Sequence, residues 1–547
     1  MEIRGSKVMV LGAYGEVGIA VTRLIIREGP SKLIISSLRK DEVEEVKKEI
    51  GSSSEFPCEI VTFWGNLFLS EEMKEITLKD VSDEKDLFFM LEENFGELNE
   101  KILNRSTLFR LITEESPHII VDCLNTASGL AYFDIYSLFE ELKRVKMDQE
   151  ALSIPLACKI FLASGLPLLV RHVQILYEAL KRAGVNVYIK VGTTGTGGMG
   201  FNIPFTHGER TPSMLLMMKS AIAGAHSMLL YVMSKTPGSP IIKEVKPATM
   251  IAWKRIGKGK ILRGGKPIKV YDAPYETPFV LKRGSRFSLK DLKMEGHETG
   301  EFLEGTYIDT GENGLFSVYE FKAVSKEGLM EFITPEEVAK RVLDCIKGAS
   351  YPNDIITSLD SSVLRSTYKA GLLREVAIRE MESLKIQGFS YGLLGPRVSK
   401  LIYESAILKE CFRTANNLIC QTPAYIAEKA KDFVLQKENH LRKEALSIGI
   451  PVLLPDGKTL LFAKREIHDK DWERESWEVQ EEKIDLFAEK EWIDLRENNM
   501  KRWQDRMRRF LSTNASGTER KEIAIDPGDL TAWVLIEEYG GGRRECY

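Results

Sequence analysis

Three glycines near the N-terminus have the spacing of a phosphate-binding turn. Gly12, Gly15 and Gly18 follow the short apolar run 8–11 and lead into a segment of helical period at 19–27. A glycine-marked turn from a strand into a helix directs backbone N–H groups and the positive end of the helix dipole at one point, which suits a pyrophosphate. Three glycines can also simply form a tight, well-packed turn. The residues expected to contact a dinucleotide here are Gly12, Tyr14, Gly15, Glu16, Val17 and Gly18.

The residues after the second apolar run bear on which dinucleotide could bind. Lys32–Ser36 reads as a strand, and Ser37 and Arg39 follow it with no acid before Asp41. A site selective for NAD usually places an acid there to accept from the ribose hydroxyls, whereas the 2′-phosphate of NADP needs donors and positive charge. Ser37 and Arg39 therefore favour NADP as the cofactor, with NAD possible. The alternative is that Arg39 only begins the solvated helix expected at 41–49.

The spacing Gly-x-x-Gly-x-x-Gly at 12–18 resembles that of the extended short-chain dehydrogenase/reductase superfamily, and the resemblance covers specifically residues 1–235. Members often carry Gly-Asp-Leu after the third strand, with the Asp facing the adenine. This chain has Gly65-Asn66-Leu67 after the expected strand 59–63, so Asn66 departs from the pattern, although its amide can still hydrogen-bond a base edge. The resemblance implies that Asn66 and Leu67 contact the cofactor.

A loop of small residues follows the next expected strand, at 118–122. Its residues Asn125, Thr126 and Ala127 are similar to the loop that passes under the nicotinamide half of the cofactor in this superfamily. Small residues let a backbone approach a cofactor closely, although they also end strands in any α/β sheet. The resemblance implies that these three residues bind the cofactor.

Hydroxyl side chains follow the expected strand 186–191, at Thr193 and Thr194. In the same superfamily a Ser or Thr at this position polarises the substrate oxygen, and a Tyr-x-x-x-Lys pair on the next helix supplies the proton. The Lys lowers the pKa of the Tyr and holds the nicotinamide ribose. The resemblance therefore implies that Thr193 and Thr194 are catalytic.

The helix that should carry this pair starts at Pro212, because proline is favoured at the first helical position. Lys219 stands at the Lys position, so the resemblance implies a catalytic and cofactor-binding role for it, but Leu215 stands at the Tyr position. Tyr231 and Lys235 match the Tyr-x-x-x-Lys motif in sequence. A helix rises about 1.5 Å per residue, however, so Tyr231 would lie roughly 24 Å beyond Leu215. The usual acid is therefore replaced by leucine.

His207 is a candidate substitute for the missing acid, with Glu209 as its partner, because both precede this helix and could enter the same crevice. The alternative is a hydrogen-bonded loop histidine without chemistry. Three functions follow: an NADP-dependent oxidoreductase acting on a carbonyl or alcohol of a small molecule, a non-catalytic NADP-binding scaffold or sensor, and an epimerase or lyase on the same fold. Leu215 is the residue that distinguishes these functions, because hydride transfer to a carbonyl needs a proton source and leucine has none. We expect an enzyme, with the oxidoreductase favoured.

Apolar runs alternate with segments of helical period around these residues. This alternation predicts an α/β fold with a doubly wound, Rossmann-type parallel sheet. In such sheets ligands bind at the carboxyl ends of the strands. We therefore expect the segments 12–18, 125–128 and 193–200 to line one crevice.

Composition and periodicity divide the chain into three expected domains. Residues 1–235 form the NAD(P)-binding domain, 236–350 form a β-containing substrate region, and 351–547 form a mostly helical C-terminal domain. The substrate region returns to the first domain through a helix that begins with the capping box Thr334-Pro335-Glu336-Glu337. Its basic turns at 254–266 could hold a phosphate or carboxylate, or could form only a solvated hairpin.

Turn residues and helical period predict the other elements beyond residue 240. One hairpin turns at Glu312-Asn313-Gly314, between arms at 306–308 and 316–319, and another turns at Asp456-Gly457. The helices of the last domain are expected at 372–386, 398–416, 424–446 and 486–511.

The composition of the 547 residues excludes several classes of protein. Lysines and arginines number 76 against 80 acids, so the net charge of −4 favours neither nucleic acid nor an anionic membrane as a partner. Seven scattered cysteines without C-x-x-C predict no disulfide framework and no metal site.

The apolar run 214–233 contains Lys219 and His226, which indicates a buried helix and not a membrane span. With no signal peptide evident, we expect a cytoplasmic protein that binds a small-molecule substrate and could form homo-oligomers.

Overall fold

The chain falls into two compact units that interleave along the sequence. Unit 1 comprises Met1–Gly200, Ser213–Ala252 and Glu331–Ala370, and unit 2 comprises Phe201–Pro212, Trp253–Met330 and Gly371–Tyr547. The division into three domains at residues 235 and 350 stays a prediction. The computed structural model describes all residues except 52–56, 77–80, 82, 131–132, 148–151, 193–213, 248–249, 264–265, 274–277, 288–296, 311–313, 327–332, 350–360, 365–367, 386, 464–476, 515–522 and 539–547.

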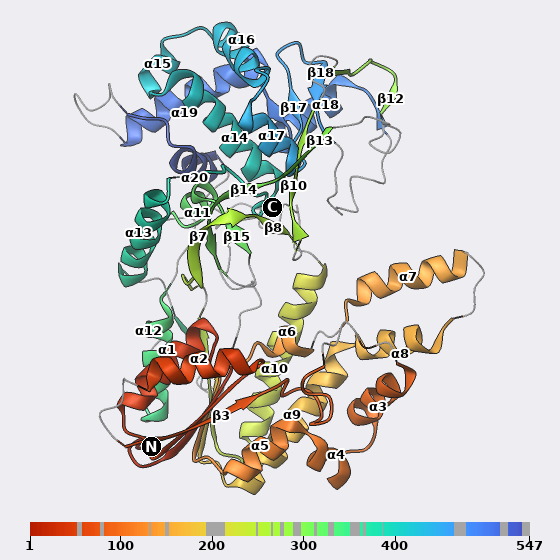
Figure 1. Ribbon diagram of the computed structural model, residues 1–547, viewed down its shortest axis with the longest axis vertical. Helices are drawn as coiled ribbons and strands as arrows, with labels where there is room; N and C mark the ends of the chain where they lie inside the picture. The colour runs from red at the N-terminus through yellow and green to blue at the C-terminus, as the bar shows by residue number, and fades with distance from the viewer. Residues whose placement is uncertain are drawn as a thin grey trace. The chain divides into compact units, whose positions relative to one another are not determined.

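Unit 1 is built on a seven-stranded sheet in which every pair of neighbours is parallel (Figure 1). The strand order β16-β6-β5-β4-β1-β2-β3 reverses its direction of winding between β1 and β4. This is a doubly wound, Rossmann-like order, and it confirms the predicted fold class. The strands are β1 (Lys7–Leu11), β2 (Lys32–Ser37), β3 (Glu59–Trp64), β4 (Ile119–Asp122), β5 (Val187–Val191), β6 (Ile241–Pro247) and β16 (Ser361–Leu364).

Helices cover both faces of this sheet. In β1, Val8 and Val10 pack with α1, α2 and α12, whereas Met9 and Leu11 pack with α5, α9 and α10. Successive side chains of a strand point to opposite faces, so a strand covered on both faces is a continuous apolar run. The helices are α1 (Glu16–Arg27), α2 (Lys40–Ile50), α5 (Thr107–Glu115), α9 (Gly165–Ala183), α10 (Met214–Ser234) and α12 (Pro335–Ile346).

Helix α12 is the predicted return helix. The side chain of Thr334 accepts a hydrogen bond from the Glu337 N–H, and the Glu337 carboxylate accepts from the Thr334 N–H, so the predicted capping box is present. The helix packs against α1.

Shorter helices connect the strands of unit 1. They are α3 (Glu84–Phe95), α4 (Glu100–Arg105), α6 (Thr126–Leu130), α7 (Ile135–Met147) and α8 (Ile154–Leu162). Among the described residues, no single helix is long and apolar enough to cross a membrane, and α8 and α9 meet that criterion only as a pair bent by 64°.

Unit 2 contains small sheets that are mostly antiparallel. Ile308 pairs with Phe316, which confirms the first predicted hairpin, and β17 and β18 pair across the predicted turn at Asp456-Gly457. The basic stretch 254–266 contributes β7, which pairs with β14. The strands are β7 (Arg255–Lys260), β8 (Leu262–Arg263), β9 (Lys266–Pro267), β10 (Lys269–Asp272), β11 (Phe279–Val280), β12 (Arg286–Phe287), β13 (His297–Phe302), β14 (Glu304–Asp309), β15 (Leu315–Phe316), β17 (Val452–Leu453), β18 (Thr459–Leu461), β19 (Trp477–Glu478) and β20 (Ile493–Asp494).

The remainder of unit 2 is helical, as predicted for this part of the chain. Helix α14 packs against α16, α17 and α20, and α19 packs against α16. The helices are α11 (Val318–Val324), α14 (Gly395–Phe412), α15 (Ala415–Ile419), α16 (Pro423–Val434), α17 (His440–Ser447), α18 (Glu481–Lys490), α19 (Glu497–Asn514) and α20 (Pro527–Glu538), and α13 (Tyr368–Ser383) begins at the boundary of the units.

Three predicted elements end earlier than expected. The predicted helix 398–416 stops at Phe412, because Arg413 has a φ of +62° and Thr414 caps α15. The second arm of the first hairpin stops at Phe316, because Ser317 caps α11 and forms a capping box with Glu320. The predicted helix 424–446 is two helices, because Asn439 caps α17 through its side chain.

The single helix predicted at 486–511 is wrong. Helix α18 ends at Lys490, and the strand β20 separates it from α19. The break has a packing cause: Ile493 pairs in parallel with Val452, so these residues complete a sheet instead of a helix.

Candidate nucleotide-binding site

Two of the three glycines in the turn between β1 and α1 are required by the packing of the chain itself. Gly12 has a φ of +74°, and a Cβ there would lie 3.2 Å from the backbone carbonyl carbon of Cys123. A Cβ at Gly18 would overlap the carbonyl oxygen of Gly12. Helix α1 can therefore pack this closely on the turn only with glycine at position 18.

Gly15 is different, because the surrounding chain leaves room for a side chain there. It is exposed, it caps α1 in an extended conformation, and a Cβ would find one atom within 4 Å, the Gly12 carbonyl oxygen at 3.6 Å. The N–H groups in the first turn of α1 have no acceptor within the helix and form the positive end of its dipole. An exposed glycine beside these donors makes a cradle that fits a pyrophosphate.

The other residues predicted for this turn surround the cradle. Tyr14, Glu16 and Val17 are half-buried, and Tyr14 and Val17 pack against the core beneath α1. Burial raises the pKa of the Tyr14 hydroxyl, and the nearby carboxylates of Glu45 and Glu42 raise it further. Tyr14 is therefore a neutral hydrogen-bonding group at the edge of the turn.

An acid that the sequence analysis missed lies beside Ser37 and Arg39. The Ser37 hydroxyl donates to Glu42 Oε2 at 2.6 Å, and the Arg39 guanidinium lies 3.1 Å from Glu42 Oε1. Glu42 is the third residue of α2, and its carboxylate also accepts from the Arg39 N–H at 3.3 Å. A Glu at the third helical position is readable in the sequence. The two groups expected to bind a 2′-phosphate therefore already contact a carboxylate, which could itself accept from ribose hydroxyls.

The turn after β3 holds Asn66 through its own backbone. Asn66 Oδ1 accepts from the Phe68 N–H at 3.0 Å, which leaves the amide nitrogen as the atom for a base edge. The side chain of Leu67 is buried in the core, so only its backbone could contact a ligand.

The loop after β4 lies directly beside the glycine turn. The Cys123 N–H donates to the Leu11 carbonyl at 2.9 Å, extending the pairing of β1 with β4. Asn125 is exposed, whereas Thr126 and Ala127 are buried at the start of α6. The buried Thr126 hydroxyl has no hydrogen-bond partner among the described residues. The structure thus brings two of the three predicted segments to one edge of the sheet.

A buried ion pair fixes this loop, and the sequence analysis did not identify it. Lys190 Nζ lies 2.9 Å from Asp122 Oδ1 and donates to the Leu124 carbonyl at 2.7 Å. The Leu124 N–H and the Tyr188 hydroxyl both donate to Asp122, at 2.9 and 2.6 Å. A lysine inside the apolar strand 187–191 was the available signal. Lys190 and Asp122 both form hydrogen bonds with the backbone of Leu124. They therefore position the loop that carries Asn125 and Thr126.

Two neutral histidines continue this buried polar region. Burial lowers the pKa of His172, on α9, to about 4 and lowers that of His226, on α10, well below its usual range. Their ring centroids lie 6.0 Å apart, and the His172 ring lies 5.0 Å from that of Phe68. The turn after β3 therefore packs directly on α9.

The predicted catalytic residues fall mostly on undescribed parts of the chain. Thr193, Thr194 and His207 lie outside the described residues, as does the side chain of Leu215. Lys219 is half-buried near the start of α10, a helix that packs against α6 and β6. Tyr231 is near the other end of that helix, which closes at Ser234. No cluster of three or more His, Cys, Asp or Glu that could hold a metal occurs in the described part of the chain.

Comparisons with known proteins give one family match. Residues 270–538 match the family model described as the β-methylindole-3-pyruvate reductase C-terminal domain. No curated protein matches the chain.

Solved structures give distant similarities. A short-chain dehydrogenase/reductase from Serratia marcescens is 13% identical, with 66% of this chain and 98% of that chain covered and a TM-score of 0.29. MalC reductase/Diels-Alderase from Malbranchea aurantiaca is 14% identical over 68% and 97% of the two chains, with a TM-score of 0.31. Pen from Bacillus thuringiensis is 9% identical over 70% and 77%, with a TM-score of 0.30. By the family match, residues 270–538 are thus similar to the C-terminal domain of β-methylindole-3-pyruvate reductase.

Proposed function

We propose that this protein is a nicotinamide-dependent oxidoreductase that acts on the carbonyl or alcohol of a small molecule, with the cytoplasm as its location. NADP is the favoured cofactor, because the Arg39 guanidinium is exposed at the site, and NAD is the alternative, because Glu42 could accept from its ribose hydroxyls. The observation that carries the proposal is the cradle at Gly15, beside the N-terminus of α1. This glycine is exposed, and the packing of the surrounding chain would leave room for a side chain there. The match of residues 270–538 supports a 2-oxo acid with an aromatic side chain as the substrate class.

The bound cofactor would supply the hydride. In this proposal Asn125, Thr126 and Ala127 approach the nicotinamide half, and the ion pair of Lys190 with Asp122 keeps their loop in place. Lys219 holds the ribose, Thr193 or Thr194 polarises the substrate oxygen, and His207 supplies the proton that Leu215 cannot.

The test is reduction of indole-3-pyruvate and phenylpyruvate by NADPH and NADH, followed by absorbance at 340 nm. Lys219→Ala should lower kcat/KM by about 10²-fold or more, the range of a positioned acid–base group, and Tyr231→Phe should change it less than about twofold. If Tyr231→Phe abolished turnover and Lys219→Ala kept it, the assignment of Lys219 as the residue of α10 that contacts the cofactor would be wrong.

A non-catalytic scaffold or sensor is the second candidate, because leucine stands where the acid is expected. It predicts that NADPH binds while neither oxo acid is reduced. For the cofactor, Arg39→Ala should weaken NADPH binding by about 1.5–3 kcal/mol if the guanidinium contacts the phosphate. Equal affinities of the wild-type protein for NADPH and NADH would contradict the preference for NADP.

A further inference from the structure

A small cavity in unit 1 is enclosed by the turn after β3, the end of α3, the α4–α5 connection and α9. Its volume is ≈ 30 Å³. One water needs about 10–15 Å³ by this measure, so the cavity holds roughly two waters or one ion of similar size. Apolar side chains close it on several sides, and six polar side chains line it: Ser70, Glu93, Asn94, Ser106, Arg171 and His172. Asn94 donates to the Met90 carbonyl, and the Ser106 hydroxyl accepts from the Phe109 N–H.

The polar groups of this cavity are buried and incompletely bonded. Arg171 is 7% exposed, and its guanidinium donates through Nη2 to the Gly96 carbonyl. The other two guanidinium nitrogens, Nε and Nη1, have no hydrogen-bond partner among the described residues. The same holds in this part of the chain for Ser70 Oγ, Glu93 Oε1 and His172 Nε2, of which Ser70 and His172 are also more than nine-tenths buried.

Arg171 brings a positive charge into this cavity. Arginine keeps its proton in proteins, and no ion pair to Arg171 occurs among the described residues. Glu93 compensates this charge only in part near neutral pH, because burial raises its pKa to about 7, although the Arg105 charge lowers that pKa again in part. Arg105 is itself shared with Glu72, at 3.9 Å. His172 is neutral, since burial holds its pKa near 4.

Water alone would satisfy the donors but would leave the buried Arg171 charge without a full counter-charge, which is unfavourable. A small anion would satisfy the Arg171 nitrogens and accept from Ser70 at the same time. The volume admits a halide or formate and is too small for phosphate or a dicarboxylate.

We propose that this cavity is a binding site for a small monovalent anion, held by the Arg171 guanidinium and the Ser70 hydroxyl. The site joins α9 to the turn that begins at Asn66 and includes Phe68, whose ring contacts His172. Anion binding therefore stabilises the adenine edge of the candidate nucleotide site, although the proposal does not depend on any reaction there.

The probe is bromide, because its anomalous scattering distinguishes it from water. In crystals of the full chain grown in sodium bromide, an anomalous peak is expected within hydrogen-bond distance of the Arg171 guanidinium. In solution at constant ionic strength, replacing gluconate by bromide, chloride or formate should raise Tm by about 2 °C or more in a saturable manner. Sulfate should give only the non-saturable rise that follows from its exclusion from the protein surface, and the same rise in Arg171→Met.

Two variants make the test specific. Arg171→Met should abolish both the peak and the saturable Tm shift, and Glu93→Gln should keep them, because it retains the shape without a charge. The exposed Arg110→Met is the matched control and should respond as wild type. An unoccupied or water-filled cavity in the bromide crystal, or an equal Tm shift in Arg171→Met, would overturn the proposal.

Discussion

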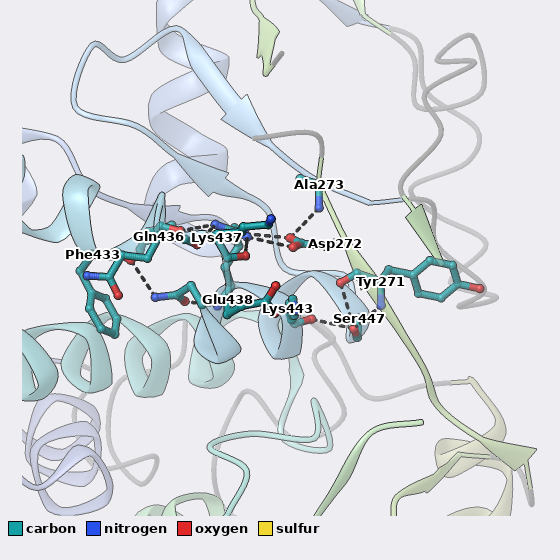
Figure 2. Close-up of polar contacts among 12 residues, drawn as sticks. Tyr271, Asp272, Ala273, Phe433, Gln436, Lys437, Glu438, Lys443 and Ser447 are labelled. Atoms are coloured by element: carbon teal, nitrogen blue, oxygen red, sulfur yellow. Dashed lines mark hydrogen bonds and ion pairs between the residues drawn. The ribbon is translucent and has the colours of Figure 1, made fainter. Parts of the chain in front are cut away.

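Arg171 in unit 1 and Arg442 in unit 2 are both buried, but their surroundings differ. Arg442 donates Nε and Nη2 to the two Asp272 carboxylate oxygens at 2.7 and 2.8 Å, and its remaining hydrogens go to backbone carbonyls of the turn after α16. Figure 2 shows Asp272 beside the turn residues Gln436 and Lys437. Arg171 has one backbone acceptor and no carboxylate among the described residues. A complete set of partners indicates a structural role, and an incomplete set points to a ligand.

Glu404 shows the same completeness in unit 2. Its carboxylate accepts from Lys400 at 2.5 Å, from the Asp494 N–H at 2.7 Å and from Trp503 Nε1 at 2.9 Å. These bonds join α14, β20 and α19. In unit 1, the pair of Lys190 with Asp122 is comparable, and it lies beside the loop predicted to contact the cofactor.

The largest effect is expected from replacing Arg442, the buried arginine with a complete set of hydrogen-bond partners. Arg442→Met leaves the Asp272 carboxylate buried without its partner, so the free energy of unfolding of unit 2 should fall by about 3–5 kcal/mol. Tryptophan fluorescence during urea unfolding reports on this unit, because only Trp64 of the seven tryptophans lies outside it. The exposed pair of Arg283 with Glu481 is the control, and Arg283→Met should cost less than about 1 kcal/mol. Equal losses in both variants would contradict the structural role.

The next effect is the pH dependence of unit 1. His172 has a folded-state pKa of about 4 against an ordinary 6.5, so the unfolded state binds more protons between these values. The stability contribution is therefore present above pH 6.5 and is lost as the pH falls towards 4, by roughly 2–3 kcal/mol. Hydrogen exchange of α9 peptides measures it, and His172→Gln should flatten the profile. A wild-type profile that is already flat from pH 4 to 6.5 would contradict the burial of His172.

Unit 2 should show the opposite sign through Glu444. Burial raises the pKa of this carboxyl from 4.5 to about 7, while the Phe389 N–H that it accepts lowers it in part. The folded state therefore keeps a proton that the unfolded state loses, and stability falls as the pH rises from 4.5 to 7. We expect a loss of about 1–2 kcal/mol after allowance for solvent screening, because the side chain is only partly buried. Glu444→Gln should remove this slope in tryptophan-monitored unfolding, and an unchanged slope would assign it to another group.

The sequence predicted the sheet of unit 1 because local signals sufficed there. Apolar runs, a glycine turn and helical period are contained within about thirty residues each, and they fix the order of elements. The hairpin at Asp456-Gly457 and the capping box at Thr334 were predictable for the same reason.

The candidate site was less predictable, because its polar contacts join distant residues. Lys190 meets Asp122 from another strand, and nothing near Arg171 indicates that the residues after β3 enclose it. Similarly, β20 could not be distinguished from a helix until Ile493 paired with Val452. Glu42 is the exception, since it stands close to Ser37 and Arg39 in the sequence and its contacts with them are local.

The measurement that tests the central claim most directly is calorimetric titration of NADPH and NADH into wild type, Gly15→Ala and Gly18→Ala. Gly15→Ala should keep the thermal stability of wild type within about 0.5 kcal/mol and lose NADPH affinity by tenfold or more, because the new methyl group enters the cradle and meets no other chain atom closely. Gly18→Ala should lose both affinity and stability, the latter by about 1–3 kcal/mol, through overlap with Gly12. Unchanged NADPH affinity in a folded Gly15→Ala protein would contradict a dinucleotide site at this turn.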